Sequence, residues 1–375
     1  MKLYLVAGEA SGDARGAELM RALRERTPSL QFLGAGGREM RALAGDDFLD
    51  WEGEAVVGLW DVLKKYRYFK AQFDHMLADI ARVQPVAVIY IDYPGFNLRM
   101  AKVVKQRLPG VRNIYYVSPQ VWAWHRSRIP KMARFLDLML CIFPFEKDLY
   151  EASGLRTVFV GHPMLDSLEA RRIDEPRDPD LVGLFPGSRD REVRRIFPVM
   201  IEAAERMREA KPGLRFEAAA ASHLLADRML AMLAATGHDE RFCAVHVRAS
   251  HELMQRAGVG VVCSGTATLE AAFFAMPMCV VYKVAWLTWA VAKRLVRVPF
   301  IGMPNVLADR EIAREFLQGA AQPDAIAEEM LRLLRDPEAY TAAERDLAAV
   351  IAGLGPRGAA ARAADAISEI LKFPA

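Results

Sequence analysis

Two short glycine-serine segments, each preceded by an apolar run and followed by a helical pattern, constrain the fold of this chain most. The first is Gly8-Glu9-Ala10-Ser11-Gly12-Asp13, and the second is Pro186-Gly187-Ser188-Arg189. The helical patterns that follow them cover residues 14–26 and 192–210. A strand that ends in a glycine loop at a helix start presents backbone N–H groups and the positive end of a helix dipole to an anion. One such unit in each half predicts an α/β protein of two Rossmann-like, doubly wound domains that face each other across a cleft, with a phosphate-bearing ligand between them.

Apolar runs alternate with helical patterns along both halves, which is typical of parallel sheets covered on both faces. The predicted strands cover residues 2–7, 31–34, 86–92, 113–117, 136–142 and 156–160, and then 181–185, 215–220, 243–246, 259–263 and 278–284. The charged, proline-bearing stretch 171–180 has no period and predicts an interdomain linker. We therefore expect an N-terminal acceptor domain over 1–170, a C-terminal nucleotide domain over 181–350, and a terminal helix within 351–375 that packs back on the first domain.

Composition restricts the class of protein. The 375 residues are 53% hydrophobic and 26% charged, which is typical of a globular protein large enough for two cores. The net charge of +3 gives no indication of a nucleic-acid partner. The four cysteines are scattered in apolar stretches and indicate reduced thiols. Because Met1 leads directly into a strand and the apolar run 284–292 is too short for a bilayer span, we expect a cytoplasmic protein.

The run Ser264-Gly265-Thr266-Ala267-Thr268-Leu269-Glu270 follows the predicted strand 259–263 and indicates a diphosphate site at a helix start. Glu270 falls about a turn and a half into that helix, where its carboxylate could accept both hydroxyls of a ribose. An ordinary helix cap with a solvated glutamate is the alternative. Beside Gly187 and Ser188, Arg189 could clamp a departing phosphate, although a surface arginine fits the same position.

Asp92 ends the predicted strand 86–92. Ligands in open parallel sheets bind at the carboxyl ends of strands, so Asp92 is our candidate general base for an attacking hydroxyl. A turn or helix-cap aspartate is an equally good interpretation of its spacing. The first glycine loop provides the candidate acceptor contacts Glu9, Ser11, Gly12 and Asp13. The alternative is a plain tight turn in which Asp13 caps the following helix.

The segment 115–124 is dense in aromatic residues and follows another predicted strand. Such a surface suits stacking against sugar rings, with Gln120 reaching a hydroxyl and Trp122 contacting the acceptor. A packed corner beneath the ligand explains the tryptophans at least as well.

Metal ligation is not predicted, since the seven histidines have no ligand spacing. Asp178-Pro179-Asp180 spells an acidic pair that often binds divalent metals, but it lies among prolines and indicates a solvated turn. Two basic-aromatic stretches, 56–70 and 286–294, suit contact with an anionic membrane surface. Each stretch alone also fits an amphipathic core helix with a basic outer face.

Taken in chain order, these segments resemble the lipid-A-disaccharide synthase family of bacterial glycosyltransferases. The motifs that carry the resemblance span nearly the whole chain: Gly8–Asp13, Ile91–Asn97, Tyr116–Trp124, Phe143–Glu146, Gly161–Pro163, Pro186–Arg189, Ser264–Glu270 and Pro304–Leu307. Gly95 stands where family members carry a second aspartate, so Asp92 is the carboxylate of that motif here.

The resemblance implies a GT-B fold and a metal-independent, cofactor-free inverting transfer at the cytoplasmic face of the inner membrane. The donor would be UDP-2,3-diacylglucosamine and the acceptor 2,3-diacylglucosamine 1-phosphate (lipid X). The products would be a β-1,6-linked tetraacyl disaccharide 1-phosphate and UDP. Asn305 and Gln318 lie in family-like segments and join the expected donor site. Family members can form dimers through their C-terminal regions, so a homodimer is among the assemblies implied.

Three other functions share parts of this pattern. A UDP-sugar 2-epimerase has the same two-domain architecture but would form an isomer from the donor alone. A non-catalytic nucleotide or lipid binding protein would bind UDP without turnover and leaves Asp92 unexplained. A dehydrogenase fits less well, because Gly34-Ala35-Gly36-Gly37 follows a strand but lacks the full G-x-G-x-x-G pattern.

Overall fold

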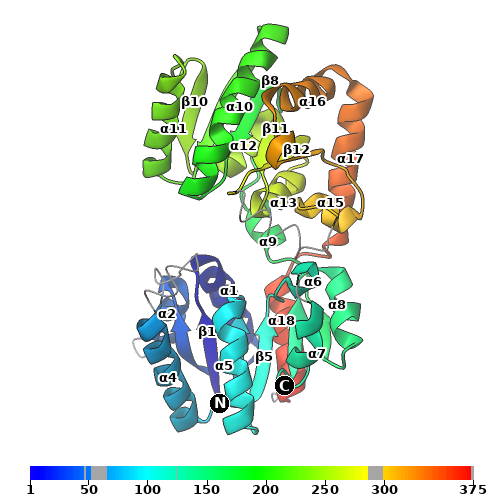
Figure 1. Ribbon diagram of the computed structural model, residues 1–375. Helices are drawn as coiled ribbons and strands as arrows, with labels where there is room; N and C mark the ends of the chain where they lie inside the picture. Colours follow the sequence, from blue (N-terminus) through cyan, green and yellow to red (C-terminus); the bar gives the residue numbers. More distant parts are fainter. Residues whose placement is uncertain (46–47, 52–65, 125, 286–298, 373–375) are drawn as a thin grey trace. The chain divides into compact units, whose positions relative to one another are not determined.

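The computed structural model describes residues 1–45, 48–51, 66–124, 126–285 and 299–372 (Figure 1). The chain divides into two compact units: unit 1 contains Met1–Pro163 with Leu354–Ala375, and unit 2 contains Met164–Gly353. The chain therefore passes between the units twice, and both of its ends belong to unit 1. The stretch 171–180, predicted as the linker, lies inside unit 2.

Unit 1 contains a seven-stranded parallel sheet in the order β3-β2-β1-β4-β5-β6-β7. Its strands are β1 (Lys2–Ala7), β2 (Gln31–Gly36), β3 (Leu49–Asp50), β4 (Ala87–Ile91), β5 (Arg112–Tyr116), β6 (Leu138–Cys141) and β7 (Thr157–Phe159). Its helices are α1 (Ala10–Arg26), α2 (Arg38–Ala44), α4 (Tyr66–Val83), α5 (Pro94–Arg107), α6 (Val121–Trp124), α7 (Ile129–Met132), α8 (Pro144–Glu151) and α18 (Ala359–Leu371), with a 3-10 turn at Arg126–Arg128. The interior strands β4 and β6 are buried throughout, as expected for a sheet covered by helices on both faces.

Unit 2 repeats this design with a six-stranded parallel sheet in the order β10-β9-β8-β11-β12-β13. Its strands are β8 (Asp178–Phe185), β9 (Arg215–Ala220), β10 (Cys243–Val247), β11 (Ala257–Cys263), β12 (Met278–Tyr282) and β13 (Glu315–Leu317). Its helices are α9 (Met164–Glu169), α10 (Asp190–Ala210), α11 (His223–Ala235), α12 (Ser250–Arg256), α13 (Thr266–Phe273), α15 (Met303–Ala308), α16 (Pro323–Arg335) and α17 (Pro337–Gly353), with a 3-10 turn at Gln318–Ala320.

Both sheets reverse their strand order beside their first strand. β1 lies between β2 and β4, and β8 lies between β9 and β11. Ala7 at the end of β1 pairs with Ile91 at the end of β4, and Phe185 at the end of β8 pairs with Val262 near the end of β11. The loops that follow these strands therefore lie side by side, at the place where open α/β sheets bind ligands.

Helices α1 and α10 begin earlier than the apolar pattern predicted, at Ala10 rather than residue 14 and at Asp190 rather than residue 192. The first turn of α1 is built from small residues, which carry no apolar stripe. A Cβ at Gly16 would lie 2.3 Å from the sulfur of Met40, so glycine lets α1 and α2 approach closely. As a result, most of the first glycine loop is helix, and its ligand-facing part is shorter than expected.

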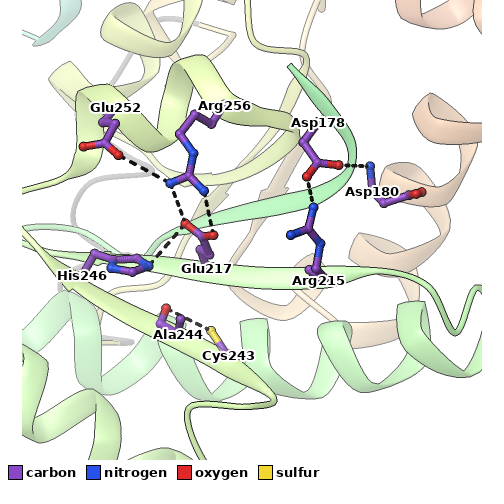
Figure 2. Close-up of polar contacts among 9 residues, drawn as sticks. All are labelled: Asp178, Asp180, Arg215, Glu217, Cys243, Ala244, His246, Glu252 and Arg256. Atoms are coloured by element: carbon purple, nitrogen blue, oxygen red, sulfur yellow. Dashed lines mark hydrogen bonds and ion pairs between the residues drawn. The ribbon is translucent and has the colours of Figure 1, made fainter. Parts of the chain in front are cut away.

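The prediction of a solvated turn at Asp178-Pro179-Asp180 is wrong, because β8 already begins at Asp178. The Asp178 carboxylate forms an ion pair with Arg215 on β9 and accepts the backbone N–H of Asp180 at 3.0 Å (Figure 2). The pairing of β8 with β9 brings Arg215 to this carboxylate, a contact that no local pattern predicts.

The C-terminal helix α18, red in Figure 1, belongs to unit 1 although it follows all of unit 2 in the sequence. Arg26 at the end of α1 donates to the Asp365 carboxylate at 2.6 Å, and Arg362 donates to the carbonyl of Val160 at 2.9 Å. Ile367 is fully buried. The last helix therefore completes the core of unit 1.

Candidate active site

Asp92 directly follows β4 at the strand reversal of unit 1. Asp92 and Tyr93 both have left-handed backbones, with φ of 50° and 48°, a conformation that costs a non-glycine residue roughly 1–2 kcal/mol. The surrounding structure holds it in place. The N–H of Asp92 donates to the Tyr116 carbonyl at 3.0 Å, and its carbonyl accepts the Asn97 amide at 2.8 Å and the Tyr115 hydroxyl at 2.6 Å. Strain maintained in this way is typical of functional sites.

The carboxylate of Asp92 is half-buried, with 35% of its side chain exposed. One oxygen accepts the Tyr93 N–H at 2.9 Å, and the other lies 3.5 Å from a guanidinium nitrogen of Arg15 on α1. Burial raises the pKa of Asp92 above its ordinary value, while Arg15 and the Tyr93 N–H act in the opposite direction. A raised pKa and an accessible oxygen suit a carboxylate that takes a proton from a hydroxyl.

The first glycine loop meets Asp92 through the ring of Tyr93. A Cβ at Gly8 would lie 2.6 Å from that ring, so glycine is needed at the end of β1. Glu9 and Ser11 are exposed at the start of α1, and Gly12 is buried.

Asp13, predicted to contact the acceptor or to cap its own helix, caps α2 instead. Its carboxylate accepts the backbone N–H groups of Gly37 and Glu39 at 2.8 Å and of Met40 at 3.0 Å, and its side chain is buried. Asp13 therefore fixes α2 against α1, and its carboxylate bonds to backbone groups of the protein.

Glu146 holds the aromatic segment after β5. This carboxylate is fully buried at the start of α8 and accepts the Trp122 indole N–H at 2.9 Å and the Ser118 hydroxyl at 2.5 Å. Burial raises the pKa of Glu146 to about 7, against these two donors. Only the motif Phe143–Glu146 pointed to this residue in the sequence, and no role was assigned to it.

Trp122 is only 5% exposed, so its indole lies beneath the surface that was expected to stack on a sugar. The ring of Phe145 packs edge-on against Trp122 with centroids 5.0 Å apart and is itself 38% exposed. Gln120 is exposed. Phe145 therefore provides the exposed aromatic surface at this position, and Trp122 supports it.

In unit 2, Pro186–Arg189 follows β8. Gly187 has φ of 107°, and a Cβ there would lie 2.5 Å from a carboxylate oxygen of Glu192 and 3.3 Å from the sulfur of Cys263, so this position requires glycine. Arg189 caps α10. Its N–H and guanidinium both donate to Glu192, at 3.2 and 2.9 Å. The Arg189 side chain remains 64% exposed and Ser188 is exposed, so both can reach a ligand.

The second loop of unit 2 follows β11 and begins α13 at Thr266, with φ of 153° at Gly265. The Ser264 hydroxyl donates to the Ile301 carbonyl at 3.1 Å, and the Thr268 hydroxyl donates to the Gly265 carbonyl at 2.8 Å. Thr268 is fully buried, whereas Gly265 and Thr266 are exposed and Ala267 is partly exposed. The first N–H groups of a helix have no intrahelical partner. The Ser264 and Thr268 hydroxyls therefore bond to the protein, and the backbone N–H groups are the main donors at this candidate anion site.

Asn305 and Gln318, both expected in the donor site, bond to the protein itself. Asn305 is fully buried, where it accepts the N–H groups of Ile312 and Ala313 and donates to Glu315 at 2.9 Å. With its amide nitrogen turned toward the Val284 carbonyl, Gln318 donates at 3.1 Å and accepts the Val284 N–H at 3.0 Å. Both side chains therefore support the segments near β12 and β13, and Asn305 has no exposed surface.

Two further sequence expectations concern membrane and metal. The stretch 286–294 and most of 56–70 lie outside the described residues. In the part of the chain that the structure describes, no helix combines the length and apolar character that a bilayer crossing requires. Over the same residues, His, Cys, Asp and Glu side chains form no group of three or more that could hold a metal ion.

Comparisons with known proteins identify the family. The family model described as Lipid-A-disaccharide synthetase matches residues 3–368. A lipid-A-disaccharide synthase of Trichlorobacter lovleyi is 40% identical over 379 residues, covering 99% of this chain and 98% of the relative. One from Azotobacter vinelandii is 38% identical over 383 residues, covering 99% of this chain and 98% of the relative.

Solved structures with low sequence identity share the fold. UDP-GlcNAc 2-epimerase of Neisseria meningitidis, bound to UDP-GlcNAc, has a TM-score of 0.61 at 11% identity, covering 100% of both chains. MurG of Acinetobacter baumannii has a TM-score of 0.54 at 13% identity, covering 98% of this chain and 99% of that chain. These similarities confirm the predicted GT-B fold of two Rossmann-like domains, and the family match decides among the functions that the sequence left open. The chain belongs to the lipid-A-disaccharide synthase family, and its activity is that of a glycosyltransferase of lipid A biosynthesis.

Proposed function

We propose that this glycosyltransferase joins UDP-2,3-diacylglucosamine to lipid X with inversion, releasing UDP and a β-1,6-linked tetraacyl disaccharide 1-phosphate. The observation that carries the proposal is that the candidate residues of each unit lie where the strand order of its sheet reverses. Asp92 follows β4 beside β1, and the two anion-binding loops follow β8 and β11. Each unit thus contributes one ligand-binding edge.

The edge of unit 2 binds the donor nucleotide. The N–H groups at the start of α13 and the exposed guanidinium of Arg189 face the diphosphate, and Glu270 holds the ribose. As the bond from the anomeric carbon to the UDP oxygen breaks, the electron pair passes to the diphosphate. Arg189 and the helix start stabilise this charge, and losing one such preorganised donor typically costs on the order of 100-fold in rate.

The edge of unit 1 binds the acceptor. The 6-hydroxyl of lipid X attacks the anomeric carbon from the face opposite UDP, and its proton passes to the Asp92 carboxylate. Glu9, Ser11 and Gln120 are exposed around this edge and contact the acceptor. A Cβ at Gly95 would meet nothing within 4 Å, so no steric demand of the fold explains why this chain has glycine where the family has aspartate.

The acyl chains of both substrates require access to a lipid surface. We include in the proposal that the protein works at the cytoplasmic face of the inner membrane, and that the stretches 56–70 and 286–294 contact anionic lipid. Aromatic residues beside lysine and arginine in both stretches support this. The proposal also includes a metal-independent reaction and a homodimer.

UDP release from the diacyl donor, measured in detergent micelles with and without lipid X, tests the proposed reaction. We expect release that depends on the acceptor and a tetraacyl disaccharide phosphate by mass spectrometry. Release without acceptor dependence would instead indicate hydrolysis or epimerisation, and no release despite UDP binding would leave only a binding function.

Asp92→Asn should lower kcat on the order of 100-fold or more, because it removes the proton acceptor. It should leave the affinity for UDP unchanged, since Asp92 lies in unit 1. Asp74→Asn on α4, which removes an exposed carboxylate paired with Lys70 in the same unit, is the matched control and should retain activity. Wild-type turnover by Asp92→Asn would remove Asp92 from the mechanism.

A further inference from the structure

His251, near the start of α12, joins two charged side chains in unit 2. Its Nε2 lies 3.2 Å from a carboxylate oxygen of Glu270 on α13, and its Nδ1 lies 2.8 Å from a guanidinium nitrogen of Arg171. His251 and Glu270 retain 22% and 24% exposure, so the pair lies at the surface edge of the unit. Among the described residues, His251 is the sole polar partner of the Glu270 carboxylate.

The two partners determine which ring nitrogen carries the proton. A guanidinium donates hydrogen bonds and cannot accept them, so Nδ1 must present its lone pair to Arg171. A carboxylate accepts, so Nε2 must carry the hydrogen toward Glu270. A neutral imidazole in this one tautomer satisfies both contacts, and rotation of the ring would break both.

Gln255, also on α12, holds the backbone of Arg171 and of His251 in place. Its side chain is buried and accepts the Ile173 N–H at 2.9 Å, while its amide donates to the carbonyls of Arg171 and His251, both at 3.0 Å. The segment that carries Arg171 is thus bound to the helix that carries His251.

The far end of α12 is anchored separately. Arg256, the last residue of the helix, donates to both carboxylate oxygens of Glu217 on β9, at 3.0 and 3.2 Å, and also lies near Glu252 (Figure 2). Helix α12 is therefore held at both ends, and His251 projects toward α13 from a fixed support.

We propose that His251 is a positioning residue for nucleotide recognition. By donating to one oxygen of Glu270, it orients the carboxylate so that the other oxygen accepts the ribose hydroxyls of the donor. This inference rests on the proposed role of Glu270 in ribose binding. His251 itself touches no substrate and acts only through Glu270.

A purely structural link between α12 and α13 is the competing explanation, since the His251 ring also lies 6.0 Å from that of Phe274. A structural link would affect stability, and would weaken all nucleotides equally. Orientation of Glu270 would affect only ligands that carry the ribose hydroxyl. The two explanations therefore differ in their effect on UDP relative to 2′-deoxy-UDP.

The test is calorimetric measurement of the Kd values of UDP and 2′-deoxy-UDP for the full-length protein. Because 2′-deoxy-UDP lacks one hydroxyl that can donate to the charged carboxylate, we expect wild type to bind UDP with a Kd about tenfold lower than that of 2′-deoxy-UDP. We expect His251→Phe, which keeps a ring but loses both polar contacts, to bring the two affinities nearly together while the Kd of 2′-deoxy-UDP changes little. His251→Gln, which keeps a donor in reach of Glu270, should restore most of the preference.

The shorter His251→Asn retains an acceptor for Arg171 but cannot reach Glu270, so it should behave like His251→Phe. If the Phe variant does not fold, the difference between the Gln and Asn variants in their preference for UDP over 2′-deoxy-UDP provides the test. His238→Phe is the matched control, since His238 pairs with Glu205 at 2.5 Å in the same unit, outside the contacts that anchor α12, and it should keep the full preference.

Glu270→Ala, which removes the acceptor, separates failure of the inference from failure of the function on which it rests. If wild type shows no preference for UDP, or Glu270→Ala keeps it, Glu270 does not bind the ribose. If Glu270→Ala loses the preference but His251→Phe keeps it in full, the positioning role of His251 is overturned and the contact is structural.

Discussion

At the scale of single residues, the environment of Asp92 combines opposing effects on one carboxylate. Its left-handed backbone places the side chain at the end of β4, and burial favours the protonated form. The guanidinium of Arg15 on α1 favours the ionised form of this carboxylate, which is the form that a general base needs. His162, near Arg15, has its pKa lowered to about 3 by burial and by that cation, so it stays neutral over the working range.

Replacing Arg15 with methionine should move the acid limb of the pH–rate profile to higher pH. Loss of the cation raises the pKa of Asp92 further, so the carboxylate becomes protonated, and inactive as a base, at a pH where the wild type is still ionised. The measurement is kcat/KM against pH for wild type and Arg15→Met. Arg21→Met on the same helix, whose partner Glu39 lies 3.8 Å away at the surface, should leave the limb in place. An unshifted limb in Arg15→Met would mean that another group controls it.

At the scale of elements, Glu146 links the start of α8 to the segment after β5. This segment leaves the strand through Val117, whose φ of 67° is unfavourable for a β-branched residue, so it needs support from outside. Hydrogen bonds from Ser118 and Trp122 to the buried carboxylate provide it. The position of the exposed Gln120 and Phe145 thus depends on one buried acid.

The free energy of unfolding should fall as pH rises from about 5 through 7, because burial raises the pKa of Glu146 to about 7 in the folded state. A carboxyl with a raised folded pKa contributes its full stability below the unfolded pKa and loses it as pH rises through the folded value. The loss is on the order of 2–3 kcal/mol when the group is ionised. Urea unfolding at pH 5 and pH 8 measures it.

Glu146→Gln, which cannot ionise, should remove most of this pH dependence. Glu151→Gln, an exposed glutamate at the end of the same helix, should retain it. Equal pH dependence in both variants would assign the effect to other groups.

At the scale of the whole molecule, the last helix of the chain completes the first unit. Ile367→Ala in α18 should destabilise unit 1 by about 2–4 kcal/mol, because it leaves a cavity in a buried position. It should leave UDP binding by unit 2 unchanged. Thermal unfolding with and without UDP measures both effects, since a ligand stabilises the unit that binds it.

Glu369→Ala is the control. It removes an exposed carboxylate of α18 that pairs with Arg156, and it should change stability little. If Ile367→Ala weakened UDP binding as much as it lowered stability, the two units would not behave as separate cooperative bodies.

The amino-acid sequence by itself determined the elements and the strand ends that carry the chemistry. Largely apolar runs predicted β1 and β9 with their observed bounds, Lys2–Ala7 and Arg215–Ala220, because burial on both faces favours apolar residues at most positions of such strands. Asp92 was identified because it ends the predicted strand 86–92, and Gly187 because it lies in the loop that follows the predicted strand 181–185. Helix starts were placed less well, since α1 begins with small residues that give no apolar stripe.

Only the tertiary structure decided which candidate polar side chains bond to the protein itself and which remain exposed. Asp13 meets the backbone of α2, Asn305 meets residues 312–315, and Trp122 meets Glu146, so each of these candidates bonds to a partner outside its own helix. His251 and Glu270 come together in the same way across 19 positions. Local sequence patterns reflect burial and backbone preference. The pairing of polar groups depends instead on how sheets and helices pack, and this packing depends on all residues of the close-packed core together.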